Sequence, residues 1–291
     1  MAKNKLLILG ALGMLGGELQ KVFRADKNYQ VWAWDKNEID IANQKDVATK
    51  IFKLKPGVII NAAAYNAVDK AEEPAEFALA KKINGQAPGW LAKVAKKIGA
   101  VLVHFSTDYV FAGRKKAGYK ENDRPAPLSR YARTKLLGEQ AVRQKGEKYY
   151  LIRLQKLFGR PAKSAGAKKS FFEVMLTLAK ERQEFDMVDE ELANFTYAPD
   201  LARRVKELLE SDTPFGLYHI TNEGQPVTWY GAAKKLFALA GVKGIKLNAV
   251  GPEKYPRPAR RPKYSVLLNT KLPPLRPWEK ALKEFLRTLK T

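Results

Sequence analysis

The sequence predicts an α/β fold built on a parallel sheet with helices on both faces. Two observations support this prediction. Short, nearly uninterrupted apolar runs alternate with helical patterns through the first half of the chain, and a sheet buried on both faces needs such runs. A glycine-rich turn also follows the first run directly. We therefore expect a doubly wound parallel sheet with a smaller α/β lobe at the carboxyl-terminal end.

The expected strands and helices follow one another in a regular order. Strands are predicted at residues 6–9, 30–34, 58–60, 101–105 and 149–153. Helices are predicted between them at residues 14–24, 44–54, 75–97 and 128–143. Beyond about residue 155 the alternation loosens, with helices expected at residues 170–180, 228–240 and 278–289 and a strand at 215–220. This divides the chain into a first domain, residues 1–155, and a lobe, residues 156–291, with some of its segments expected to return to the sheet.

Composition narrows the classes of site that the chain can carry. Its 291 residues contain no cysteine and two histidines, which excludes disulfides and thiol catalysis and argues against a histidine-rich metal site. The formal net charge is +23, from 53 basic and 30 acidic residues. Such an excess fits nucleic acid, anionic lipid, an anionic small substrate or a lysine-rich surface.

The first seventeen residues allow two interpretations. Lys3 and Lys5 followed by an apolar run and small residues resemble a signal peptide, which would make the protein secreted. A buried strand followed by a glycine turn and an amphipathic helix is the interpretation we favour. No apolar run approaches the roughly 18 residues that would span a bilayer. We therefore expect a cytoplasmic protein without a membrane partner.

The turn after the first strand has the spacing GxxGxxG, formed by Gly10, Gly13 and Gly16. Glycine allows a tight turn, a close approach of the backbone to a pyrophosphate and close contact of helix and strand. Its place between a strand and a helix favours a dinucleotide site in a Rossmann-type domain. Asp35 ends the second strand and would accept hydrogen bonds from a ribose, which favours NADH. Its neighbour Lys36 could contact a 2′-phosphate, so NADPH stays open.

A second set of residues carries the chemistry of proton transfer. Tyr131 and Lys135 are four residues apart on a predicted helix and share one face. A lysine ammonium close to the phenol would lower the pKa of the tyrosine, which could then protonate a carbonyl oxygen. Thr107 follows the fourth strand, where its hydroxyl could orient that carbonyl. The glycine turn, the hydroxyl and the YxxxK pair, in that order, form a specific combination.

Segments along the whole chain resemble the extended short-chain dehydrogenases/reductases, and within them the dTDP-4-dehydrorhamnose reductases. These segments are GALGMLG, NAAAYNAVDKAE, STDYVF, YARTKLLGE, YAPDLA, GLYHITNEG and RPARRPKYSVLLNTKL. The resemblance implies a Rossmann domain with a lobe that holds a nucleotide-diphospho sugar. It also implies an NAD(P)H-dependent reduction of the 4-keto group of a dTDP-6-deoxy sugar, giving dTDP-L-rhamnose for cell-wall polysaccharide.

The resemblance assigns roles to individual positions. The implied catalytic residues are Thr107, Tyr131 and Lys135. The cofactor positions are Gly10, Gly13, Met14, Leu15, Gly16, Asp35, Lys36, Asp40, Ile41, Ala62, Ala63, Ala64, Phe105, Tyr131 and Lys135. The substrate positions are Val68, Thr107, Asp108, Tyr109, Tyr131, Lys156, Arg257 and Arg260.

The sequence departs from the family pattern near the substrate. Lys156 stands where the family usually has a tryptophan, Ala112 where aspartate is usual and Asn66 where threonine is common. Residues 189–196 differ from the Asp-Gln-x-Gly-x-Pro-Thr run that is usual in the family. Two alternatives to an active reductase therefore stay open. One is a non-catalytic NADP-binding regulatory protein, like the β subunit of methionine adenosyltransferase. The other is a recoded reductase variant with altered or lost activity.

The basic residues and the possible metal ligands lead to further expectations about what the protein binds. Arg257 and Arg260 lie in a proline-rich loop and could bind a diphosphate. The basic clusters lack a regular pattern of interleaved aromatic residues, so no nucleic-acid partner is expected. Some relatives are described with magnesium, but no oxygen-ligand spacing supports a metal here. We expect a monomer or a homodimer, and His104 and His219 in the core.

Overall fold

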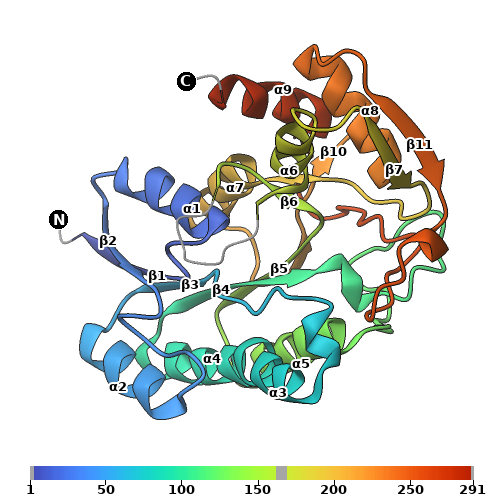
Figure 1. Cartoon of the computed structure of the whole chain (residues 1–291). Coiled ribbons are helices and arrows are strands. Elements are labelled where there is room, and N and C mark those ends of the chain that lie inside the picture. The colour runs from blue at the N-terminus through green and yellow to red at the C-terminus, as the bar shows by residue number, and fades with distance from the viewer. Residues whose placement is uncertain (1–2, 162–168, 290–291) are drawn as a thin grey trace.

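A six-stranded parallel sheet forms the centre of the computed structural model, which describes residues 3–161 and 169–289 (Figure 1). The strand order is β2-β1-β3-β4-β5-β9. The strands are β1 (Asn4–Leu9), β2 (Tyr29–Trp34), β3 (Val58–Asn61), β4 (Val101–Thr107), β5 (Tyr149–Leu154) and β9 (Gly216–His219). The α/β prediction and the parallel sheet are thereby confirmed. The run predicted as a first strand lies buried between β2 and β3.

Helices cover both faces of this sheet (Figure 1). On one face lie α2 (Gln44–Leu54), α3 (Pro74–Ala80), α4 (Ala87–Ile98) and α5 (Arg130–Lys145). On the other lie α1 (Met14–Arg24) and α7 (Ala198–Glu210), which pack against each other. Two apolar clusters fill the space between the helices and the sheet, one on each face. Both faces of the central strands are therefore buried, which agrees with their continuous apolar sequences.

The second half of the chain contributes to the sheet and also builds a smaller lobe. Strand β9 pairs with β5, so residues after 155 complete the edge of the sheet. The lobe contains β6 (Leu157–Phe158), α6 (Phe171–Leu178), β7 (Glu184–Val188), β8 (Thr196–Tyr197), β10 (Asn222–Glu223), α8 (Trp229–Ala240), β11 (Lys246–Val250), β12 (Leu275–Pro277) and α9 (Trp278–Thr288). An aromatic cluster from α6, α8 and α9 forms its core.

One predicted helix differs from the observed structure. The stretch expected as a single helix over residues 75–97 is α3, a π-helical turn and α4 in succession. Asn84 lies in the π-helical turn and exchanges two hydrogen bonds with the backbone of Tyr65. Pro88 follows in the first turn of α4, where its missing N–H costs nothing. The turn thus joins the segment after β3 to the helices below it.

Candidate active site

The glycine turn fits a dinucleotide because two of its glycines have no room for a side chain. Gly10 has a φ of +72°, and a Cβ there would lie 2.6 Å from the backbone nitrogen of Ala63. A Cβ on Gly16 would lie 2.1 Å from the carbonyl oxygen of Gly10. Gly13 begins α1, and no described side chain caps that end of the helix. The backbone N–H groups and the helix dipole at this end are therefore available to an anion.

Asp35 lies beside this turn at the end of β2. Its carboxylate accepts hydrogen bonds from the backbone N–H groups of Leu12, at 3.0 Å, and Lys36, at 2.9 Å. The Lys36 side chain is exposed. Asp40 is exposed as well, and its carboxylate accepts from the N–H of Ala42, at 2.9 Å, within its own turn. The structure thus places Asp35 against the glycine turn. It gives the Asp40 carboxylate a local partner.

Most of the remaining cofactor positions lie at the start of α1 or after strands of the sheet. Met14 and Leu15 form the first turn of α1, and Ile41 follows β2. Ala62, Ala63 and Ala64 follow β3, and the Ala62 N–H donates to the carbonyl of Leu9 at 3.0 Å. Small residues here let β3 approach the turn closely, as the contact between Gly10 and Ala63 requires.

Thr107, Tyr131 and Lys135 come together at the carboxyl end of β4. Thr107 is the last residue of β4, while the other two share one face of α5. The ammonium of Lys135 donates to the carbonyl of Phe105 at 2.6 Å. The Thr107 hydroxyl is close enough to the Tyr131 phenol to influence its pKa. Three residues separated in sequence therefore converge on one buried spot.

The electrostatics of this cluster differ from the expectation that lysine lowers the pKa of the phenol. Burial raises the pKa of Tyr131 above its usual value of 10.0, and the negative charge of Asp108 raises it further, while the nearby Thr107 hydroxyl opposes both. Burial lowers the pKa of Lys135 to about 8, and the Glu139 carboxylate opposes this. The Lys135 ammonium donates to the Phe105 carbonyl, and it is not among the groups that shift the pKa of Tyr131.

The Thr107 hydroxyl is also engaged differently from the expectation. It donates to Asp108 at 3.1 Å, and its oxygen accepts from the Tyr109 N–H at 3.2 Å. Asp108 is buried, which raises the pKa of its carboxyl to about 6. The Tyr109 ring meets the Tyr131 ring edge to face at 6.3 Å, and Val68 packs in the same cluster. These four expected substrate positions thus border the phenol of Tyr131.

Lys156 lies in the turn after β5, at the same edge of the sheet. It has a φ of +29°, which is rare for a residue with a side chain. Its ammonium donates to the carbonyl of Glu191 at 2.9 Å and lies 4.1 Å from the centre of the Trp229 ring. Burial lowers the pKa of Lys156 to about 8, and the negative charges of Asp108 and Glu191 oppose this. The side chain therefore joins the sheet edge to the smaller lobe.

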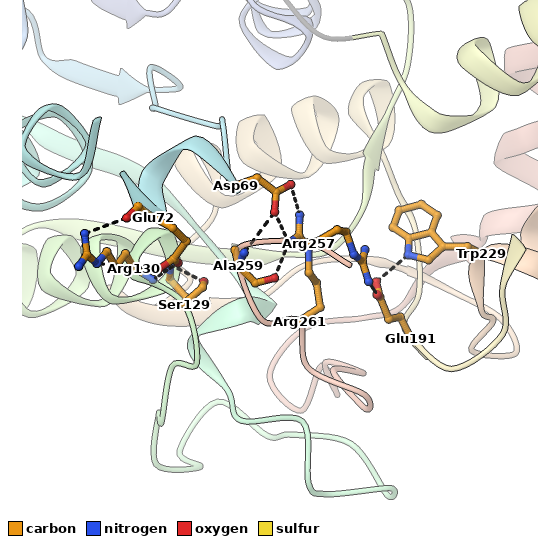
Figure 2. A network of polar contacts seen from close by, with 10 residues as sticks. Asp69, Glu72, Ser129, Arg130, Glu191, Trp229, Arg257, Ala259 and Arg261 are labelled. Atoms are coloured by element: carbon orange, nitrogen blue, oxygen red, sulfur yellow. Dashed lines mark hydrogen bonds and ion pairs between the residues drawn. The ribbon is translucent and has the colours of Figure 1, made fainter. Parts of the chain in front are cut away.

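Two arginines of the proline-rich loop, residues 255–263, form ion pairs with acidic residues, one on the side of the sheet and one in the lobe (Figure 2). Arg261 forms a two-pronged ion pair with Asp69, at 2.5 and 2.6 Å. Arg257 pairs with Glu191, which also accepts from the indole N–H of Trp229 at 2.8 Å. Arg260, expected as a substrate residue, is exposed.

A cavity of about 310 Å³ opens next to this loop. Its lining combines aromatic rings, a guanidinium and apolar strand residues: Phe171, Asp186, Met187, Val188, Trp229, Tyr255 and Arg257. Of these residues, only Arg257 was predicted from the sequence, because the aromatic residues belong to no motif. A second hollow of about 160 Å³ lies between α2 and α4, away from all the residues described above.

The two histidines lie in the core. His104 contacts the amide of Asn61 through Nδ1 at 3.1 Å, and burial holds its pKa well below the usual value. His219 donates from Nδ1 to the carbonyl of Leu268 at 3.1 Å, and burial lowers its pKa to about 4. Among the described residues, no group of three or more His, Cys, Asp or Glu side chains could hold a metal ion. No helix in the described parts of the chain is long and apolar enough to cross a membrane.

Comparison with known proteins finds relatives that match nearly the whole chain. A family model described as "RmlD substrate binding domain" matches residues 4–291. The dTDP-4-dehydrorhamnose reductase of Escherichia coli is 37% identical, over 91% of this chain and 89% of its own. The spore coat polysaccharide biosynthesis protein SpsK of Bacillus subtilis is 34% identical, over 98% and 97%.

Solved structures agree with these relatives. The dTDP-4-dehydrorhamnose reductase of Bacillus anthracis, in complex with NADP, is 33% identical with a TM-score of 0.91, and all of both chains is covered. The counterpart from Clostridium acetobutylicum is 38% identical with a TM-score of 0.92, over 99% of this chain and 100% of that one. The chain therefore belongs to the family that the RmlD substrate binding domain defines.

Proposed function

We propose that the protein reduces the 4-keto group of dTDP-4-dehydrorhamnose to give dTDP-L-rhamnose, in the cytoplasm, with NADPH or NADH as the reductant. One observation carries this proposal: Thr107, Tyr131 and Lys135 meet at the same sheet edge as the glycine turn. A carbonyl held there would lie between a proton donor and a nicotinamide. Several curated relatives bear the name of that reductase.

The chain's own residues would perform three tasks. Tyr131 would give its phenolic proton to the C4 oxygen as hydride arrives at C4 from the nicotinamide cofactor. Its raised pKa keeps the phenol protonated at neutral pH, which suits an acid. Lys135, anchored on the Phe105 carbonyl, would hold the nicotinamide ribose and lend positive charge to the phenolate that forms.

The nucleotide end of the substrate would occupy the cavity beside the proline-rich loop. Phe171, Trp229 and Tyr255 offer aromatic faces for a base, and Arg257 offers a guanidinium for a phosphate. Lys156 behind Trp229 would hold that indole in place.

Turnover by the purified protein tests the proposal. The wild type is expected to oxidise NADPH or NADH when dTDP-4-dehydrorhamnose is added. Tyr131→Phe should lower kcat by about 10²- to 10⁴-fold, because the general acid is lost. Tyr149→Phe is the matched control. Tyr149 begins β5, at the amino end of the strand and away from the site, so this change should leave kcat unchanged. Normal turnover by Tyr131→Phe would contradict the proposal and favour a regulatory role.

A further inference from the structure

Ser265 lies on a segment that crosses the carboxyl edge of the sheet after the proline-rich loop. The Gln155 side chain holds this segment from below, donating to the Ser265 carbonyl at 2.7 Å and accepting from the Leu267 N–H at 3.1 Å. Bridges join the neighbouring residue Tyr264 to Leu192, and Leu267 to Tyr119. The backbone of Ser265 is therefore fixed without any help from its own side chain.

The Ser265 side chain instead reaches the site. Its hydroxyl donates to Oδ2 of Asp108 at 2.6 Å, and the Thr107 hydroxyl donates to Oδ1 of the same carboxylate at 3.1 Å. Ser265 is 3% and Asp108 2% exposed, so water does not compete for these bonds. An ionised carboxylate only accepts hydrogen bonds. The hydrogen of Thr107 is thus directed to Asp108, and its oxygen, which accepts from the Tyr109 N–H, keeps a second acceptor position.

We propose that Ser265 is a positioning residue for the reduction, which acts through Asp108 to fix the direction of the Thr107 hydroxyl hydrogen. With that hydrogen turned to Asp108, the Thr107 oxygen accepts from the phenol of Tyr131 and holds the proton donor in line until a carbonyl replaces it. This inference rests on the proposed function, because it assigns a task within that reduction.

The ionisation of Asp108 decides whether this arrangement exists. Besides the two hydroxyls, the groups that face its carboxylate are the ammonium of Lys156 and the phenols of Tyr109 and Tyr131. Burial raises the pKa of Asp108 to about 6, and the hydroxyls and Lys156 oppose the rise. Once protonated, the carboxyl becomes a donor and no longer requires the Thr107 hydrogen. Reduction is therefore expected to decline as the pH falls through about 6.

The test compares pH profiles of kcat/KM for the wild type and three variants, with NADPH and dTDP-4-dehydrorhamnose. Ser265→Ala removes a hydrogen bond to the charged carboxylate, so the acid limb should move to higher pH by about one unit. Ser265→Thr returns a hydroxyl and should move the limb back. Ser106→Ala is the matched control: Ser106 is buried beside Thr107, and its hydroxyl has no hydrogen-bond partner among the described residues. Coinciding profiles for Ser265→Ala and the wild type would overturn the proposal.

Unfolding provides a readout that needs no turnover. The folded pKa of Asp108 lies above its ordinary 3.8, so its contribution to stability is lost as the pH rises through about 6. Ser265→Ala raises this pKa further, and its deficit in unfolding midpoint should widen between about pH 5 and about pH 7.5. A deficit that is constant with pH would refute the link between Ser265 and Asp108. Absence of wild-type turnover with a widening deficit would refute the proposed function alone.

Discussion

Lys135 combines burial with a single carbonyl partner, and this combination makes its charge sensitive to pH. Because burial lowers the pKa of Lys135 to about 8, the ammonium is present below that pH and lost above it. We expect kcat/KM to fall as the pH rises through about 8, since a neutral Lys135 would lose its charged hydrogen bond to the nicotinamide ribose. Initial rates at subsaturating substrate, in buffers of constant ionic strength, measure this limb. A flat profile well above pH 8 would show that the charge of Lys135 is not needed.

We expect Asp35 to set the choice between the two nicotinamide cofactors. Its carboxylate is fixed against the glycine turn by the Leu12 N–H, so it would repel a 2′-phosphate and attract ribose hydroxyls. Asp35→Asn should shift the ratio of kcat/KM values toward NADPH by about tenfold, the effect of roughly 1.4 kcal/mol. Lys36→Ala should shift it the other way, because a cation close to the 2′-phosphate is removed. Equal changes in kcat/KM for NADPH and NADH would show that the adenosine ribose does not bind beside Asp35 and Lys36.

At the scale of elements, two adjacent glycines in the first turns of α1 have unequal surroundings, and only Gly16 lies against the glycine turn. A Cβ on Gly16 would overlap the Gly10 carbonyl, whereas one on Gly17 would meet nothing within 4 Å. Gly16→Ala should therefore lower the free energy of unfolding by about 1–3 kcal/mol and raise the KM for the cofactor. Gly17→Ala should stabilise the protein by up to about 1 kcal/mol, through helix propensity alone. Denaturant unfolding of both variants measures the contrast, and equal effects would contradict it.

The proline-rich loop is held by two acids that should respond oppositely to neutralisation. Glu191→Gln keeps an acceptor for the Trp229 indole but releases Arg257 to a phosphate. Its affinity for dTDP, measured by calorimetry, should rise about two- to fivefold. Asp69→Asn loosens Arg261, which anchors the loop on the sheet side, and should lower that affinity. Weaker binding by Glu191→Gln would mean that its charge orders the loop more than it competes with the ligand.

Elements were predictable where the pattern of apolar residues that indicates them lies within one segment of the chain. Helices α1 and α2 coincide with the predicted residues 14–24 and 44–54, because their apolar spacing lies within one segment. Strands β7 and β11 were not predicted, because charged and polar residues interrupt their apolar runs and they pair only with each other.

The same limit holds for the site. The glycine turn and the YxxxK pair are local patterns, and both were recognised. Ser265 and Asp108 are 157 positions apart, and Arg257 and Glu191 are 66 apart. No spacing rule connects such positions before the chain is folded. Arg260, chosen for its motif, proved exposed, whereas its neighbour Arg261 forms the anchoring ion pair.

At the scale of the whole molecule, the net charge of +23 exceeds what the site can use. The cationic side chains near it have partners, such as Arg261 with Asp69 and Lys156 with the Glu191 carbonyl. Many other cations lie exposed on the outer helices, among them Lys45 and Lys53 on α2 and Lys93 on α4. These charges have few acids within reach and repel one another across the surface.

This surplus makes a prediction about salt. Most described ion pairs are surface pairs worth little, so screening them costs little. Screening the repulsion among 53 basic residues against 30 acidic ones gains more, because every excess cation contributes. The unfolding midpoint should therefore rise as NaCl increases from about 10 mM to about 150 mM, where the Debye length shortens from about 30 Å to about 8 Å. Calorimetry at both salt levels measures this, with sodium sulfate avoided because sulfate stabilises by exclusion and binds anion sites. A midpoint that falls with salt would mean that the ion pairs outweigh the repulsion, and that the lysines are arranged with more order than their number suggests.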